Sequence, residues 1–278
     1  MAKQLPSLSR MLLPTIFSMG RGVKIAESGI KLQRSFSEVR LDATAMQAFA
    51  DFLDSENKAP LSYLYCLAQR AQIAVMLEKE FSIALPGMVH LENVLEEIAP
   101  WSAEKAFEIE VNIQVEYKSE GHLIPRCKVD FYQDAQKVVS CSSVYMARRK
   151  SKNPGKKREK QSPVFPEAIL SQKWKVAGNT GRGYAKVSGD SNPIHTHAFF
   201  AKLMGFKRPI AHGWYSVAKA VIEAETHLQK PIRYIEVAFK SPVFLPSQQD
   251  FALFEAEKGR GFSLHNSKGN LVLYGSLS

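Results

Sequence analysis

The sequence predicts an α+β protein made of two similar halves, in each of which an antiparallel sheet curls around one long helix. Helical spacing of apolar residues occurs twice, at 61–80 and at 212–228, and each segment is followed by strand-like stretches separated by short turns. One helix followed by antiparallel strands, twice over, is typical of an α+β arrangement. A chain of 278 residues can bury one large core or two ordinary ones.

The first half contains the clearest strand signal in the chain. After the helical segment LSYLYCLAQRAQIAVMLEKE (61–80), FEIEVNIQVEY (107–117) alternates apolar and polar residues throughout. Strict period-two alternation of this length predicts a half-buried strand. LIPRCKVDFYQ (123–133) and KVVSCSSVYMARR (137–149) continue the strand pattern, with the turn-rich links SEGH and DAQ between strands.

The second half repeats this order. HGWYSVAKAVIEAETHL (212–228) predicts a helix, and KGRG and SKGN predict tight turns. The predicted strands are 232–245, 251–258, 261–266 and 271–278. The segment before each helix is also similar, so that Asp54 corresponds to Asp190, whereas nothing in the first copy corresponds to His195. This asymmetry predicts one reactive half and one supporting half.

The net charge of +10 is concentrated between the two halves. RRKSKNPGKKREKQ (148–161) carries eight Lys and Arg residues against one Glu, which leaves 29 against 26 in the rest of the chain. A charge run that contains Pro and Gly is typical of a solvated linker. We therefore expect an N-terminal half at 1–147, a basic linker at 148–162 and a C-terminal half at 163–278, with no nucleic-acid partner. A phosphate-bearing partner that docks on the linker is the alternative.

The composition is that of a globular protein, with 45% hydrophobic and 23% charged residues. No apolar run approaches the roughly 18 residues of a membrane helix, so we expect no membrane span. MLLPTIF (11–17) is short and contains a proline, which argues against a signal peptide. Cys66, Cys127 and Cys141 are too few and too scattered for a disulfide framework or a zinc site. Free thiols in a reducing compartment fit better, and we expect a cytoplasmic protein.

A cluster of polar and titratable residues precedes the second helix. Asp190 and His195 are separated by Pro193, so no continuous helix joins them, and Gly189 and Asn192 are turn formers. A turn of this size can direct a carboxylate and an imidazole toward one small volume. Such a pair can hold a water, accept its proton and pass a proton on at neutral pH. No serine or cysteine nucleophile lies in a recognisable elbow nearby, so the pattern favours acid–base chemistry on water.

A second element of this chemistry is the start of the second helix. The segment PIAHG (209–213) runs directly into that helix. Free backbone N–H groups at a helix start can polarise a carbonyl oxygen, and Gly213 allows a ligand to come close. Together with the polar cluster, this arrangement suits the addition of water to an α,β-unsaturated thioester, or the reverse reaction.

The stretch YAKVSGDSNPIHTHAFFA (184–201) resembles the signature of the MaoC-like dehydratases and (R)-specific enoyl-CoA hydratases. That signature is an aromatic residue, then G-D-x-N-P-[LIV]-H, then a small residue six positions later. The matching residues are Tyr184, Gly189, Asp190, Asn192, Pro193, Ile194, His195 and Ala201. PIAHGW (209–214) is similar to the segment that leads into the family's central hot-dog helix, although a methionine is common where Trp214 stands. The resemblance covers about residues 180–220, and the two-half layout is similar to the double hot-dog members.

The resemblance implies a double hot-dog fold and a function. It implies that Asp190 and His195 act on water, that the Gly213 backbone N–H binds the thioester oxygen and that Asn192 supports them. The implied reaction is the reversible hydration of trans-2-enoyl-CoA, or the dehydration of an (R)-3-hydroxyacyl group on coenzyme A or a carrier protein. No cofactor is implied, and a homodimer is among the assemblies it allows. The implied role of the first half is to shape the acyl pocket.

Two alternatives compete with this interpretation. Asp190, His195, His197 and His212 could supply mixed N/O ligands to a metal. However, H-x-H in a proline-containing turn is a weak metal signal, and no glutamate follows at helical spacing, so we expect no metal. We expect His197 to be exposed and the His212 side chain to be structural. The second alternative is a non-catalytic module that binds an acyl thioester or an acyl carrier, and the intact Asp190/His195 pair favours the enzyme.

Overall fold

The computed structural model describes residues 29–57, 60–117, 122–147 and 163–278, and a few residues between 4 and 18. The predicted basic linker at 148–162 and most of the SEGH turn lie outside these residues, and MLLPTIF lies only partly within them. None of the helices in the described part has the combination of length and apolar character that crossing a bilayer requires.

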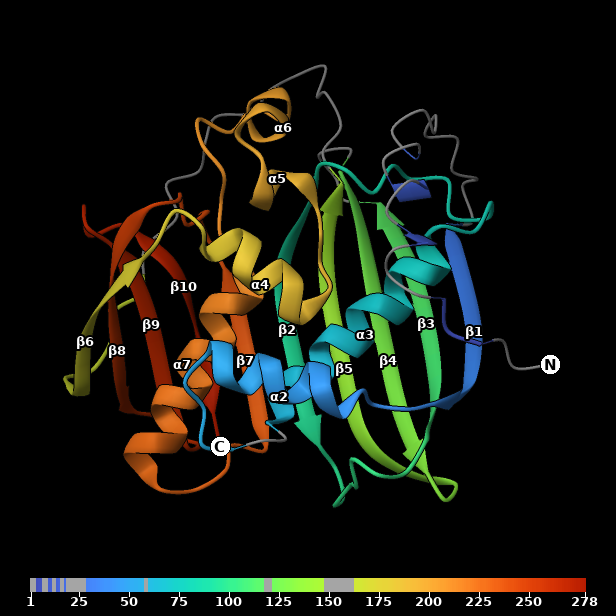
Figure 1. Ribbon diagram of the computed structural model, residues 1–278, viewed down its shortest axis with the longest axis horizontal. Helices are drawn as coiled ribbons and strands as arrows, with labels where there is room; N and C mark the ends of the chain where they lie inside the picture. The colour runs from blue at the N-terminus through green and yellow to red at the C-terminus, as the bar shows by residue number, and fades with distance from the viewer. Residues whose placement is uncertain are drawn as a thin grey trace.

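One antiparallel sheet of ten strands forms the back of the described structure (Figure 1). Its strand order is β1-β3-β4-β5-β2-β7-β10-β9-β8-β6. The strands are β1 (Ile30–Val39), β2 (Met88–Glu97), β3 (Phe107–Tyr117), β4 (Leu123–Gln133), β5 (Gln136–Ala147), β6 (Ala168–Val176), β7 (Tyr234–Phe239), β8 (Ser247–Glu255), β9 (Arg260–Asn266) and β10 (Leu271–Leu277). The order is symmetric about the β2–β7 pair, in which Leu95 is opposite Ile235. The two halves therefore join edge to edge into a single sheet.

The helices repeat the same symmetry. They are α2 (Ala43–Phe52), α3 (Leu61–Met76), α4 (Thr180–Ser188), α5 (Pro193–Thr196), α6 (Ala198–Leu203) and α7 (Gly213–Leu228). Each half runs through a strand, a short helix, a long helix and four further strands, and the C-terminal half adds α5 and α6 before its long helix. Figure 1 shows α3 crossing the strands of the N-terminal half and α7 lying in front of the C-terminal half.

Each long helix packs its apolar face against the sheet. On α3, Leu64, Ala68, Ala71 and Val75 are fully buried, at the spacing of one helix face. On β3, the apolar members of the alternating pattern from Phe107 to Val115 are buried as well. Burying one such aliphatic side chain contributes about 1.5–3 kcal/mol. The predicted α+β arrangement of a helix wrapped by an antiparallel sheet, twice over, is confirmed.

Several element boundaries differ from the prediction. The strands at 107–117 and 123–133 have their predicted bounds, and the long helices begin within one residue of prediction. The first helix ends at Met76 rather than 80, where Glu78 and Glu80 form ion pairs with Arg34 of β1. The strand predicted at 232–245 is shorter in the structure, where β7 ends at Phe239. The chain after β7 contains prolines, which have no N–H to donate to a neighbouring strand.

In each half, the last three strands pair in chain order, as β3-β4-β5 and as β8-β9-β10. The first strand after each long helix, β2 or β7, does not pair with the strand that follows it in sequence. Instead, β2 and β7 pair with each other at the centre of the sheet. The sequence patterns also missed the strands β1, β2 and β6 and the helices α2 and α4. β1 and β6 precede the helices and form the two outer edges of the sheet.

Candidate active site

The polar cluster lies in the turn between α4 and α5. Gly189 ends α4 in the left-handed conformation (φ 78°), which glycine adopts without the Cβ penalty of other residues. The backbone N–H of Asp190 then donates to Ser188 Oγ at 3.2 Å. Asn192 Oδ1 accepts from the N–H of Ile194 at 3.3 Å and caps α5, and Pro193 occupies the first turn of that helix. The turn therefore places Asp190 and His195 at the two ends of one short, capped segment.

The glycines of GNTGRG (178–183) serve helix packing at the start of α4. A Cβ on Gly181 would come within 2.0 Å of the His195 backbone oxygen, so this glycine lets α4 contact α5 closely. A Cβ on Gly183 would meet the Phe52 ring of α2 at 2.5 Å. The first approach packs α4 against the His195 segment, and the second packs α4 against α2 of the N-terminal half.

His195 has a defined tautomer. Its Nδ1 lies 2.8 Å from the Ile210 backbone oxygen, and a carbonyl oxygen can only accept, so Nδ1 carries the proton. The lone pair is then on Nε2. Burial, reinforced by the neighbouring His212, lowers the pKa of His195 to about 3 despite the opposing effect of Asp190. His195 is consequently a neutral imidazole at neutral pH, with Nε2 available as a base.

The Asp190 carboxylate is held by both of its oxygens. Oδ1 accepts from the backbone N–H of Asn192 at 3.1 Å, and Oδ2 accepts from Nε2 of Gln69 at 2.9 Å. Burial alone would raise the pKa of Asp190, but the attraction of His212 and His195, together with these hydrogen bonds, brings it below its ordinary value. Asp190 is therefore an anion at neutral pH, beside a neutral imidazole.

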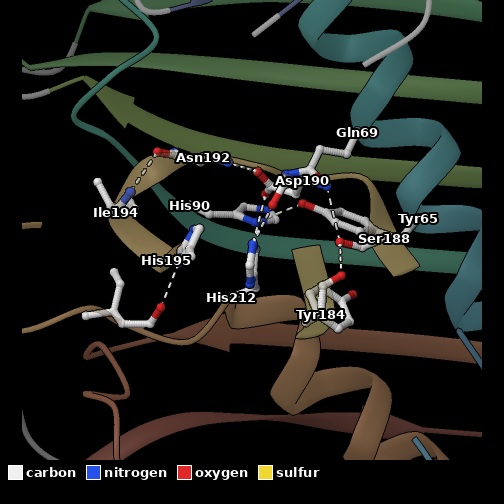
Figure 2. Close-up of polar contacts among 11 residues, drawn as sticks. Tyr65, Gln69, His90, Tyr184, Ser188, Asp190, Asn192, Ile194, His195 and His212 are labelled. Carbon is white, nitrogen blue, oxygen red and sulfur yellow. Dashed lines mark hydrogen bonds and ion pairs between the residues drawn. The ribbon is translucent and has the colours of Figure 1, made fainter. Parts of the chain in front are cut away.

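The side chain of His212 is part of the cluster, although the sequence predicted a structural role. Its ring stacks on His195 with centroids 3.7 Å apart. Its Nε2 donates to the Asp190 backbone oxygen at 2.8 Å and lies 4.0 Å from Asp190 Oδ2 (Figure 2). Burial lowers the pKa of His212, so this ring is neutral as well. Its buried Nδ1 has no hydrogen-bond partner among the described residues.

The N-terminal half contributes directly to this site. Figure 2 shows Gln69 extending from α3 toward Asp190, with Tyr65 of the same helix nearby. Tyr65 stacks on Trp214 of α7 with centroids 3.9 Å apart, and its hydroxyl lies 3.3 Å from His90 Nδ1. Helical periodicity places Gln69 at the border between the buried and exposed faces, so no local signal marked it as a site residue.

The start of α7 presents a free donor next to the cluster. His212 is the N-cap of α7 in an extended conformation, and Gly213 is the first helical residue. Gly213 is exposed, and no backbone hydrogen bond is made by its N–H in the described part of the chain. A Cβ on Gly213 would come within 2.8 Å of the Phe239 ring. A carbonyl oxygen placed there would meet this N–H and the positive end of the helix.

Of the four side chains that the sequence offered as metal ligands, the structure brings three together. Asp190, His195 and His212 each offer a ligand atom within 4.8 Å of the others. His197, in contrast, is exposed and forms the boundary between α5 and α6, as predicted. His195 Nδ1 and His212 Nε2 already donate to backbone oxygens, which leaves the other ring nitrogens and the carboxylate as ligand atoms. The expectation that the reaction needs no metal stays a prediction.

Comparisons with known proteins agree with this fold. Residues 159–273 match the MaoC like domain family. The chain is 28% identical over 237 residues to 3-hydroxyacyl-thioester dehydratase X of Mycobacterium tuberculosis, and the match covers 82% of each chain. Its fold is similar to the crystal structure of HtdX from the same organism, with a TM-score of 0.74 at 22% identity over 88% of this chain and 99% of that one.

A further similarity concerns the two-half architecture. A Mycobacterium tuberculosis protein described as having a double hotdog fold aligns with a TM-score of 0.56 at 10% identity, over 90% of this chain and 94% of that one. Its likeness extends across both halves of the ten-stranded sheet. Residues 159–273 are thus similar to the MaoC like domain family, and the two halves of the chain together have a double hot-dog fold.

Proposed function

We propose that this protein is a hydro-lyase of acyl thioesters. It would add water to a trans-2-enoyl thioester and, in the reverse direction, dehydrate an (R)-3-hydroxyacyl thioester. The observation that carries the proposal is the pairing of an ionised Asp190 with a neutral His195 whose Nε2 is free. A relative at 28% identity is named as a 3-hydroxyacyl-thioester dehydratase, which supports the same reaction class.

In the proposed mechanism, one water lies between the Asp190 carboxylate and His195 Nε2. During hydration its oxygen forms a bond to C3, the proton it loses passes to this pair, and a proton is delivered to C2. The elements of water thereby add across the double bond. As the C3–O bond forms, electrons move toward the thioester oxygen, where the Gly213 N–H donates a hydrogen bond to the developing charge.

The remaining residues support this arrangement. Asn192 acts twice, because its N–H donates to the Asp190 carboxylate and its side chain caps the helix that carries His195. We propose that residues 163–278 are the catalytic half and that residues 1–147 shape the acyl pocket, joined by the basic linker at 148–162. The stacking of Tyr65 on Trp214 across the two halves supports a shared pocket wall. The thioester carrier is coenzyme A or a carrier protein.

The deciding experiment is turnover of a short trans-2-enoyl-CoA, followed as the loss of the enoyl absorbance. We expect the wild-type protein to hydrate this thioester and Asp190→Asn to be nearly inactive. The same acyl group on a carrier protein should be tested in parallel. If the wild-type protein binds these thioesters and converts neither, the enzyme proposal is wrong and the non-catalytic binding module replaces it.

A further inference from the structure

The hydrogen bond between Gln69 and Asp190 joins residues that are 121 positions apart and belong to different halves of the chain. Gln69 lies on α3, which packs against the N-terminal part of the sheet, whereas Asp190 follows α4 of the C-terminal half. The Gln69 Nε2 donates to Asp190 Oδ2 at 2.9 Å (Figure 2). The half without an equivalent of His195 thus contacts the proposed catalytic carboxylate directly.

We propose that Gln69 is a positioning residue for the reaction, which holds the Asp190 carboxylate in one orientation and keeps it ionised. The inference rests on the proposed function, because it assigns Gln69 a role through Asp190. It also gives the N-terminal half a further role, because this half then supplies a residue that positions a reacting group and does not only form a wall of the pocket.

Two contacts fix the orientation of the Asp190 carboxylate. The terminal torsion of an aspartate side chain is broad, so a single hydrogen bond does not fix the plane of its oxygens. The Asn192 N–H holds Oδ1 from within the turn, and the Gln69 amide holds Oδ2 from the opposite half. Two donors on different oxygens define the carboxylate plane, and hence the direction in which it meets a water.

The Gln69 amide is an uncharged donor, and this affects the ionisation of Asp190. A hydrogen bond donated to a carboxylate favours the charged form, and Gln69 is one of the groups that lower the pKa of Asp190. A lysine or arginine in this position would form an ion pair and take away much of the basicity of the carboxylate. An amide donor maintains the anion without placing a fixed positive charge beside it.

The symmetry of the fold supplies an independent comparison. Gln69 is the ninth residue of α3, and the ninth residue of α7 is Val221, which is fully buried and has no donor group. Asp54, which follows α2 as Asp190 follows α4, is exposed. The amide donor is therefore present at this position of α3, which contacts the aspartate that has a histidine partner, and absent from the corresponding position of α7.

The test uses two variants of Gln69 in the full-length protein and one matched control. Gln69→Leu removes the donor, and Gln69→Glu places a second carboxylate where the amide stands. Gln72→Leu is the control, because Gln72 lies on the same helix and bonds Ser143 and Tyr145 but does not contact Asp190. The readout is the pKa of Asp190, measured from its ¹³Cγ NMR shift as a function of pH and assigned with Asp190→Asn.

We expect Gln69→Leu to raise the pKa of Asp190 by about one unit, since the lost bond is to a charged group. Gln69→Glu should raise it by about two units or more, because two adjacent carboxylates share a proton. The acid limb of kcat should move to higher pH by the same amounts, with little change in KM. Gln72→Leu should lower Tm but leave the titration of Asp190 in its wild-type position.

Two outcomes separate this inference from the proposed function. If Asp190 titrates at its wild-type position in both Gln69 variants, Gln69 is merely structural and the inference is overturned, whatever the activity. If the pKa shifts occur but the wild-type protein has no turnover, Gln69 does position Asp190 and the proposed function alone is wrong. The NMR titration thus decides the inference without depending on catalysis.

Discussion

The rings of His195 and His212 stack with their centroids 3.7 Å apart, and this contact limits the charge of the site. Two imidazolium ions cannot lie face to face at this separation in a buried environment without strong repulsion. Burial lowers the pKa of both rings, while Asp190 opposes the shift in each. The resting site at neutral pH therefore consists of one carboxylate and two neutral imidazoles.

The first prediction concerns the pH dependence of activity. The proposed mechanism needs ionised Asp190 and neutral His195, and both forms exist above the lowered pKa values of these groups. Activity is therefore lost as the pH falls toward those values, not as the pH rises through neutrality. We expect kcat to be flat between about pH 6 and 8, a range in which an unperturbed histidine would titrate. An inflection near pH 6.5 that disappears in His195→Gln would contradict this assignment.

The second prediction concerns the two reacting side chains. Asp190→Asn and His195→Gln should each lower kcat by about 10²–10⁴-fold, the usual contribution of general acid–base groups. The fold should survive, because asparagine keeps an acceptor oxygen for Gln69 or for the Asn192 N–H. Steady-state kinetics and Tm should be measured together on the same preparations.

The matched control for these variants is Asp54→Asn. Asp54 follows α2 in the position that Asp190 occupies after α4, but it is exposed and has no histidine in the place of His195. We expect this change to leave kcat within a few-fold of wild type. Near-normal activity in Asp190→Asn would contradict the assignment of the chemistry to the C-terminal half. A loss of activity in Asp54→Asn as large as that expected for Asp190→Asn would contradict it as well.

The third prediction isolates the Gly213 N–H. Gly213→Ala and Gly213→Pro both place a Cβ against the Phe239 ring, but only proline lacks the N–H. Proline suits the first position of a helix, and the extended conformation of His212 is compatible with a following proline. Gly213→Pro should therefore lose a further ~10²–10³ in kcat relative to Gly213→Ala, the cost of removing one oxyanion donor. Equal activities would show that this N–H does not contact the thioester oxygen.

Local sequence patterns captured what depends on neighbours along the chain. The alternation at 107–117 predicted β3 to the residue, because its apolar side chains from Phe107 to Val115 enter the core. β2 was missed because its pairing is irregular next to Leu91, where the register with β5 shifts, and this shift breaks the period-two pattern. β6 (AILSQKWKV) was missed because it lies at the sheet edge, where Ser171, Lys173 and Lys175 are exposed and the apolar Ile169 is exposed as well.

The site was predictable only where it is contiguous in sequence. Asp190, Asn192 and His195 are close together in the sequence, in the turn after α4 and in α5, so their spacing indicated a candidate site before the fold was known. The hydrogen bond from Gln69 depends on how the helices of the two halves pack together, with α2 against α4 and α3 against α7, a relation that no local pattern contains. The stacking of His212 on His195 likewise results from the approach of residues 209–212 to α5, where the Ile210 oxygen also accepts from His195.

The fourth prediction joins stereochemistry and metal independence. If Asp190 and His195 hold one water on one side of a thioester whose oxygen is bound at Gly213, water reaches a single face of the double bond. One 3-hydroxyacyl enantiomer must then form, and the family resemblance implies the R form. The helix start polarises the carbonyl and the carboxylate–imidazole pair moves the protons, so treatment with a chelator should leave kcat unchanged. Chiral chromatography of the product and the rate after chelation measure the two parts.

Each part of this prediction has its own contrary result. A racemic product would mean that the water is not held on one face, and the S product would contradict the family resemblance. The chelator decides the role of the histidines, because Asp190, His195 and His212 offer ligand atoms within 4.8 Å of one another. If chelation abolished activity and Zn²⁺ restored it, these atoms would be metal ligands, and the water would be activated by the ion rather than by the Asp190/His195 pair.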